Sequence, residues 1–160
     1  MPFCFSVFFL VQCRYEMHPG NQLNDRFAQP DKQKQEEMNG KIKELAQDHV
    51  VAMRREFHRS PELSGKEFHT RERLIEEIEK MGVPYEKLPG TGLIAIIEGG
   101  KPGKNKILRA DIDALPLQEE TENLKQPKVC VSEIPGRCHA CGHDAHMAML
   151  LGTMRILVQN

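Results

Sequence analysis

The chain has 160 residues, of which 39% are hydrophobic and 28% are charged, and its formal net charge is -1. This length fits one ordinary domain, and the composition is typical of a folded globular protein. The near-neutral charge gives no electrostatic reason to expect a nucleic acid or a membrane as a partner. The five cysteines show no regular disulfide spacing, which favours a reducing compartment, the cytoplasm.

Residues 1–37 are predicted to lie outside the folded domain. The apolar run at residues 3–11 is shorter than the roughly 20 residues of a membrane span. It also lacks the positively charged start and the small-residue cleavage site of a secretory signal. Residues 16–39 are polar and carry too few apolar side chains to bury much surface. We therefore expect a disordered extension or a spurious one, with Met38 as the true start, and a domain over residues 38–160.

Helical spacing of apolar side chains begins near Gly40 and predicts a helix that ends before Pro61. A second helix is predicted over about residues 66–81. Gly82 and Pro84 follow it and are typical of a helix end.

The middle of the chain is rich in β-forming residues. Residues 93–97 and 106–110 predict two strands, and the Gly- and Pro-containing segment between them predicts a hairpin. Residues 117–135 are polar and predict a surface loop. Apolar side chains over residues 147–158 then predict a buried helix, with Asp144 as its N-cap. Helices, then strands, then a buried helix indicate an α/β layer fold.

Residues 139–146 read HACGHDAH, which concentrates metal-binding side chains where a loop enters this last helix. The positive end of the helix dipole favours negatively charged groups there. Cys141 and His143 are two positions apart, so both point to one side of an extended loop. A thiolate with an imidazole suits Zn, Co, Ni or Mn. His146 lies one helical turn further on and either faces the same cavity or orients a ligand.

Two protein ligands are too few for a catalytic metal site, which usually has three or more. The most suitable upstream contributor is the predicted strand end, because carboxylates in this position of an α/β sheet commonly face the active crevice. Asp111 and Asp113 are two positions apart, so in a strand both side chains point to the same side. One of them can therefore orient a ligand histidine or assist a general base. The alternative is a structural role as a turn or strand-end cap.

Three strings in this order resemble the amidohydrolases of the aminoacylase/carboxypeptidase metallopeptidase family. This family includes hippurate hydrolases, N-acyl-amino-acid and N-acetyl-diaminopimelate deacylases, and hydrolases of indole-acetic acid conjugates. The resemblance covers about residues 40–160. The strings are HRSPELS at residues 58–64 with Glu67 and Thr70, LRADIDALP at residues 108–116, and Pro135-Gly136 followed by HACGHDAH at residues 139–146.

The resemblance implies helices packed on a mixed sheet, as in the front part of a zinc-peptidase-like catalytic domain without the inserted dimerisation domain. It implies an enzyme with two divalent ions (Zn, Mn, Co or Ni), which activate water to cleave the amide bond of an N-acyl amino acid. Cys141 and His143 correspond to metal ligands. Asp113 corresponds to a catalytic aspartate beside the site, and Asp111 stands where the wider family often has a histidine ligand. The supporting residues are Asp111, His139, Asp144 and His146.

The family's glutamate pair, its two further histidines and its dimerisation domain correspond to sequence after residue 160. We therefore expect these 160 residues to hydrolyse N-acyl amino acids at no more than a trace rate. Homo-oligomers are expected only for a full-length protein. One alternative is a non-catalytic metal-binding fragment.

Other interpretations assign the same residues structural or redox roles. Cys138 and Cys141 form a C-x-x-C pair, so a thiol redox module is an alternative function. Cys141 alone is also compatible with an inert thiol, and His139 and His146 with simple packing. For His58 and Arg59, the structural alternative is contact with the last carbonyls of the helix.

Overall fold

The computed structural model describes residues 8–14, 32–100 and 104–159 of the chain. These residues form a mixed four-stranded sheet in the order β2-β3-β1-β4 and three helices. The fold is therefore α/β with helices packed on a mixed sheet, as predicted. The elements are β1 (Phe8–Arg14), α1 (Lys32–Arg59), α2 (Phe68–Lys80), β2 (Tyr85–Lys87), β3 (Leu93–Glu98), β4 (Lys106–Asp111) and α3 (His143–Gln159).

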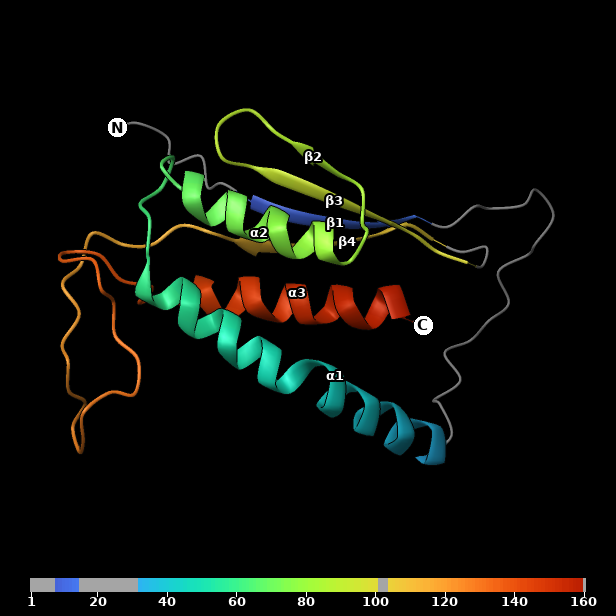
Figure 1. Ribbon diagram of the computed structural model, residues 1–160, viewed down its shortest axis with the longest axis horizontal. Coiled ribbons are helices and arrows are strands. Elements are labelled where there is room, and N and C mark those ends of the chain that lie inside the picture. The colour runs from blue at the N-terminus through green and yellow to red at the C-terminus, as the bar shows by residue number, and fades with distance from the viewer. Residues whose placement is uncertain (1–7, 15–31, 101–103, 160) are drawn as a thin grey trace.

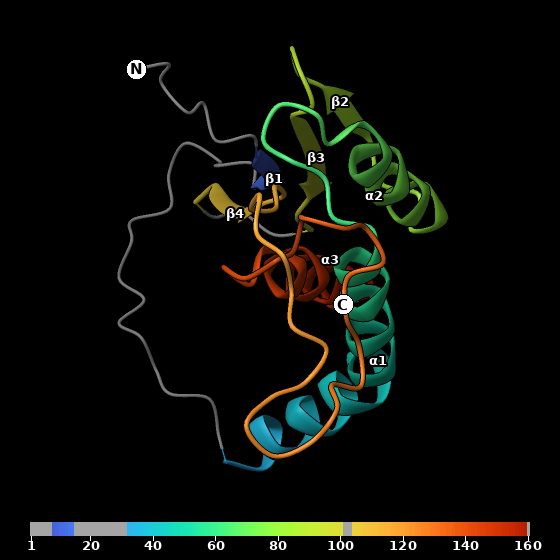
Figure 2. The same cartoon turned by 90° about the vertical axis from the view of Figure 1, so that its left-hand side faces the viewer.

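The described helices lie on one face of the sheet. α2 lies over the β2-β3 side, α3 lies beneath β1 and β4, and α1 packs alongside α3 (Figures 1 and 2). The core fills the space between these layers. It combines buried side chains of the sheet, such as Val11 and Leu93, with those of the helices, such as Phe57, Leu74 and Met147. Burial of these apolar side chains is the main force that holds α3 in place.

β1 occupies an interior position of the sheet. It pairs in parallel with β3 and antiparallel with β4, and the side chains of Phe9 and Val11 are completely buried. The expectation that the fold begins at residue 38 therefore does not hold for residues 8–14, and α1 also begins earlier, at Lys32. Short apolar runs without charge suit buried strands, which explains this position. Residues 1–7 and 15–31 lie outside the described residues.

The predicted hairpin of β3 and β4 is wrong. β1 separates the two strands, because each of them pairs with β1 along its length. The Gly- and Pro-containing segment after β3 indicates that the chain turns, but it carries no information about which strand becomes the neighbour.

The helix ends follow the sequence pattern. α1 ends at Arg59, two residues before Pro61, and α2 ends at Lys80. Gly82 has a φ of 67°, a conformation that glycine adopts without steric cost. Its N–H donates to the carbonyl of Glu79 at 2.9 Å, which satisfies a free carbonyl at the helix end.

Candidate metal centre at the start of α3

A tight turn precedes α3 and carries the cysteine of the predicted site. The N–H of Gly142 donates to the carbonyl of His139 at 3.1 Å, and Gly142 has a φ of 80°. The Gly142 carbonyl accepts the N–H groups of Ala145 and His146. Gly142 therefore precedes the helix at the cap position, where we expected Asp144, and Asp144 lies in the first turn of α3.

His143 is held by a carboxylate behind it. Its Nδ1 lies 2.9 Å from Oδ1 of Asp113 and 2.9 Å from the Asp113 carbonyl oxygen. Both partners only accept hydrogen bonds, so Nδ1 donates to them, and in the neutral ring Nε2 then carries the lone pair. Oδ2 of Asp111 lies 3.9 Å from this Nε2. A metal-binding histidine usually donates its other ring N–H to a carboxylate or a carbonyl, as Nδ1 of His143 does here.

Cys141 is solvent-exposed and lies in the turn. The chain is therefore not extended between Cys141 and His143, and the predicted reason for their pointing to the same side does not apply. His146 is exposed, and its ring centroid is 5.7 Å from that of His143. The donor set of a thiol, an imidazole and nearby carboxylates fits a borderline divalent ion. Within the described part of the chain, however, no three His, Cys, Asp or Glu side chains are gathered closely enough to hold one.

His139 is buried, and neither ring nitrogen has a hydrogen-bond partner among the described residues. Burial lowers the pKa of this imidazole to about 4, although the nearby carboxylate of Asp144 raises it in part. The side chain is therefore neutral at pH 7.

Replacing His139 with leucine should raise the free energy of unfolding of this chain by roughly 1 kcal/mol, because the substitution removes buried polar atoms that are not hydrogen-bonded. Urea unfolding at pH 7 measures the change, with His69→Leu at an exposed position of α2 as control. A clear loss of stability in His139→Leu would instead mean that the imidazole makes a stabilising interaction.

Asp144 binds two side chains of α1. Its Oδ2 lies 2.7 Å from Nδ1 of His58 and 2.8 Å from Nε of Arg54. The other ring nitrogen of His58, Nε2, lies 3.1 Å from both carboxylate oxygens of Glu119. His58 thus contacts two carboxylates, and the structural alternative of contact with helix-end carbonyls does not describe its side chain.

The three strings that carry the family resemblance meet around this helix start. The backbone N–H of Ala114 donates to the carbonyl of Glu62 at 2.7 Å, which joins the first string to the second. The Glu62 carboxylate accepts the N–H and hydroxyl of Thr70 at 2.7 and 2.8 Å, so it caps the start of α2. Asp113 in the second string contacts His143 in the third. His58 in the first string contacts Asp144 in the third.

Sequence reasoning did not identify Glu119 and Arg54 as parts of the site. Glu119 lies in the loop over residues 117–135, whose polar composition distinguishes none of its four glutamates. Arg54 lies one helical turn before His58, and this i, i+4 spacing was the available indication that the two share a face of α1.

Comparisons with known proteins agree with this arrangement. Residues 107–160 match the model of peptidase family M20/M25/M40. Thermostable carboxypeptidase 2 of Saccharolobus solfataricus is 42% identical over 127 residues, which are 78% of this chain and 31% of the relative. N-acetyldiaminopimelate deacetylase of Enterococcus faecalis is 43% identical over 72% of this chain and 30% of the relative.

A solved structure has the same fold. The YxeP protein of Bacillus subtilis, described as a dinuclear metal-binding peptidase of family M20, aligns with a TM-score of 0.58 and 37% identity. The alignment covers 69% of this chain and 30% of YxeP. The chain thus spans about a third of the length of the curated relatives it matches. No helix among the described residues has the length and apolar character needed to cross a membrane.

The mixed sheet and the buried α3 have the fold of the solved M20 peptidase over the part that aligns. Residues 107–160 match peptidase family M20/M25/M40, and the chain is similar to relatives named as a carboxypeptidase and an amidohydrolase.

Proposed function

We propose that this chain supplies part of the metal centre of an amidohydrolase that cleaves N-acyl amino acids. The observation that carries the proposal is the contact between His143 and Asp113, because it leaves Nε2 of His143 available to a divalent ion. The names of several relatives support the substrate class. They include an N-acetyldiaminopimelate deacetylase, an N-acyl-L-amino acid amidohydrolase and an N-acetylcysteine deacetylase.

In this proposal, Cys141 and His143 bind the ion, and Asp113 fixes the proton on Nδ1 of His143. A bound divalent ion would polarise the amide carbonyl and acidify a water molecule. Asp111 is the next candidate ligand, because its Oδ2 lies near Nε2 of His143. Its Oδ1 accepts a hydrogen bond from Nε of Arg109 at 2.9 Å, which orients the carboxylate.

A chimeric enzyme tests the proposed activity. The segment of the Enterococcus faecalis deacetylase that aligns with this chain would be replaced by the corresponding residues of this chain. We expect the chimera to release acetate from N-acetyldiaminopimelate and to lose this activity when Cys141 is replaced by serine. A folded, metal-loaded chimera without activity would contradict the proposal. Metal content and circular dichroism identify chimeras that failed to fold or to load.

Removing the carboxylate behind His143 should weaken metal binding. In Asp113→Ala, nothing replaces the carboxylate that holds the Nδ1 proton, so affinity for Zn²⁺ should fall roughly 10- to 100-fold. Asp113→Asn keeps a hydrogen-bond acceptor and should lose less. Competition of the 160-residue chain with a chromophoric chelator measures both affinities. Equal affinity of Asp113→Ala and the unmodified chain would rule out this role for Asp113.

The 160-residue chain by itself should hydrolyse hippurate at no more than a trace rate, with or without Zn²⁺, Mn²⁺ or Co²⁺. The described residues gather fewer than three ligands, whereas catalytic sites usually use three protein groups and an additional base. Release of glycine, measured by amine derivatisation, tests this. Metal-dependent turnover at an ordinary enzymatic rate would show that the chain provides a complete site.

A further inference from the structure

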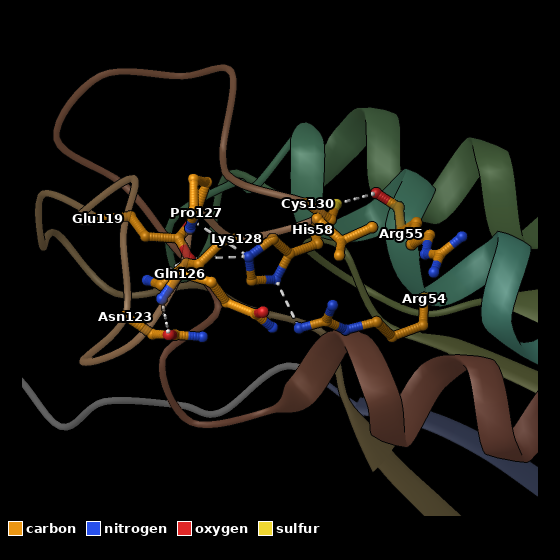
Figure 3. A pocket seen from close by; sticks show the side chains of 10 residues that line it. Arg54, Arg55, His58, Glu119, Asn123, Gln126, Pro127, Lys128 and Cys130 are labelled. Atoms are coloured by element: carbon orange, nitrogen blue, oxygen red, sulfur yellow. Dashed lines mark hydrogen bonds and ion pairs between the residues drawn. The ribbon is translucent and has the colours of Figure 1, made fainter.

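His58 lies at the C-terminal end of α1 and is 5% exposed. Both ring nitrogens face carboxylates, with Asp144 on Nδ1 and Glu119 on Nε2. Figure 3 shows the imidazole between Glu119 and Lys128 on one side and Arg54 on the other. These residues line a cavity of about 300 Å³.

The carboxylate partners define the protonation state of His58. Carboxylates only accept hydrogen bonds, so both ring nitrogens donate and the ring is an imidazolium. Nη2 of Arg54 also lies 3.2 Å from Nδ1, but Nδ1 cannot accept this proton while it donates to Asp144 at 2.7 Å. The two carboxylates are further balanced by cations, because Arg54 contacts Asp144 and Lys128 contacts Glu119. The cluster is therefore a network of paired charges, which reduces the cost of burying it.

The pair of His58 and Asp144 joins two helix ends of opposite polarity. His58 is in the last turn of α1, where the helix dipole favours a positive charge, and Asp144 is in the first turn of α3, where it favours a negative charge. Each charge is thus stabilised by its own helix as well as by its partner. The contact fixes the start of α3 against the end of α1.

Glu119 ties the loop over residues 117–135 to the same point. Its Oε2 accepts the backbone N–H of Ser132 at 2.7 Å, and its Oε1 lies 3.1 Å from Nζ of Lys128. Burial raises the pKa of Glu119, but these two hydrogen bonds and His58 outweigh it and lower the pKa overall. Glu119 is therefore ionised at neutral pH and able to hold both ends of the loop.

The loop leads directly into the turn that carries Cys141. Leu115 and Cys138 exchange two backbone hydrogen bonds of 3.0 and 3.1 Å, which close the base of the loop. His139 and Cys141 follow this base, and α3 begins at His143. Movement of either the loop or the first turn of α3 would change the position of the Cys141 thiol relative to the His143 ring.

We infer that His58 is a positioning residue of the metal centre, because it binds Asp144 in α3 and Glu119 in the loop and so holds Cys141 and His143 in a fixed relation. This inference rests on the proposed function. Asp113 holds the His143 ring from one side, and the contact between His58 and Asp144 holds the adjacent backbone of α3 from the other.

Titration of the 160-residue chain with Co²⁺ tests the inference, because thiolate ligation of Co²⁺ gives a charge-transfer absorption band. In His58→Leu, we expect the affinity for Co²⁺ to fall roughly 10-fold or more and the band to shift or weaken. His58→Gln retains an amide donor and should recover part of both. Glu119→Gln removes the charge on the loop side alone and should give an intermediate loss.

His49→Leu is the matched control. His49 lies on the same helix, and its Nε2 is 3.4 Å from Oε2 of Glu77 in α2, away from the start of α3. We expect its Co²⁺ affinity and absorption band to equal those of the unmodified chain. Folded His58→Leu and Glu119→Gln variants with unchanged affinity and an unchanged band would overturn the positioning role.

The result for the unmodified chain separates the two proposals. If neither the unmodified chain nor the chimeric enzyme gives a thiolate band, the proposed metal centre fails, and the role of His58 fails with it. If the unmodified chain gives the band and the His58 variants match it, only the positioning role fails. If His58→Leu does not fold, Glu119→Gln and His58→Gln decide between these outcomes.

Discussion

Replacing Cys141 with serine should abolish the cobalt-thiolate absorption band of this chain. Serine keeps the size of the side chain but replaces a soft, ionisable thiol by a hydroxyl that is a poor ligand for such ions. Because the substitution removes a proposed ligand, the affinity for Co²⁺ should fall by more than the roughly 10- to 100-fold that follows loss of a supporting hydrogen bond. Absorption spectroscopy during a Co²⁺ titration measures both effects.

Cys138→Ser is the control for this experiment. Cys138 is 4% exposed and takes part in the base of the loop through its backbone, whereas Cys141 is exposed. A metal centre should therefore tolerate Cys138→Ser, and a C-x-x-C redox module should not. Equal loss of cobalt binding in the two variants would argue against Cys141 as the specific ligand, and thiol-disulfide exchange that needs both cysteines would favour the redox alternative.

Replacing Phe9 with alanine should destabilise the chain by about 3 to 5 kcal/mol, the usual cost of removing a buried phenylalanine side chain. Phe9 is completely buried in β1 and faces Leu93 and Ala110 on the two neighbouring strands. A loss of this size is a large share of the stability of an ordinary domain. Urea-induced unfolding followed by circular dichroism measures it.

Leu10→Ala is the matched control, because Leu10 is on the same strand but points to the opposite face of the sheet and is only partly buried. This substitution should cost about 1 kcal/mol. If Phe9→Ala has no larger effect than Leu10→Ala, β1 does not contribute to the core. That result would support the prediction that the domain begins at residue 38.

Regular patterns made much of the fold predictable. α1 and α2 end two residues before Pro61 and Gly82, whose backbone preferences act locally. α3 follows from apolar side chains at helical spacing. β1 was not predicted, because a short apolar run is compatible with a buried strand but does not identify the strands that it would pair with. Its pairing with β3 and β4 depends on contacts between segments far apart in the sequence.

The candidate site was predictable where its chemistry is concentrated. Cys141 and His143 are identifiable because a thiol and an imidazole occur two positions apart, and Asp113 because it follows a predicted strand end; the structure brings Asp113 to His143. That Cys141 and His143 bind an ion stays a prediction. The network around His58 was not predictable in the same way, since Glu119 is 61 residues from His58 in sequence and reaches it only through the tertiary fold.

The interior position of β1 has a consequence for the order in which the sheet assembles. Phe9 pairs with Leu93 in β3 and with Ala110 in β4, so β1 is synthesised before both of its partners and each pairing must wait for a later strand. Folds dominated by such distant pairings fold slowly, because a long loop must close before any stabilising contact forms. α1 and α2 can form earlier from local contacts. Until β3 and β4 have been synthesised, the apolar segment of β1 remains available to chaperones and to neighbouring chains.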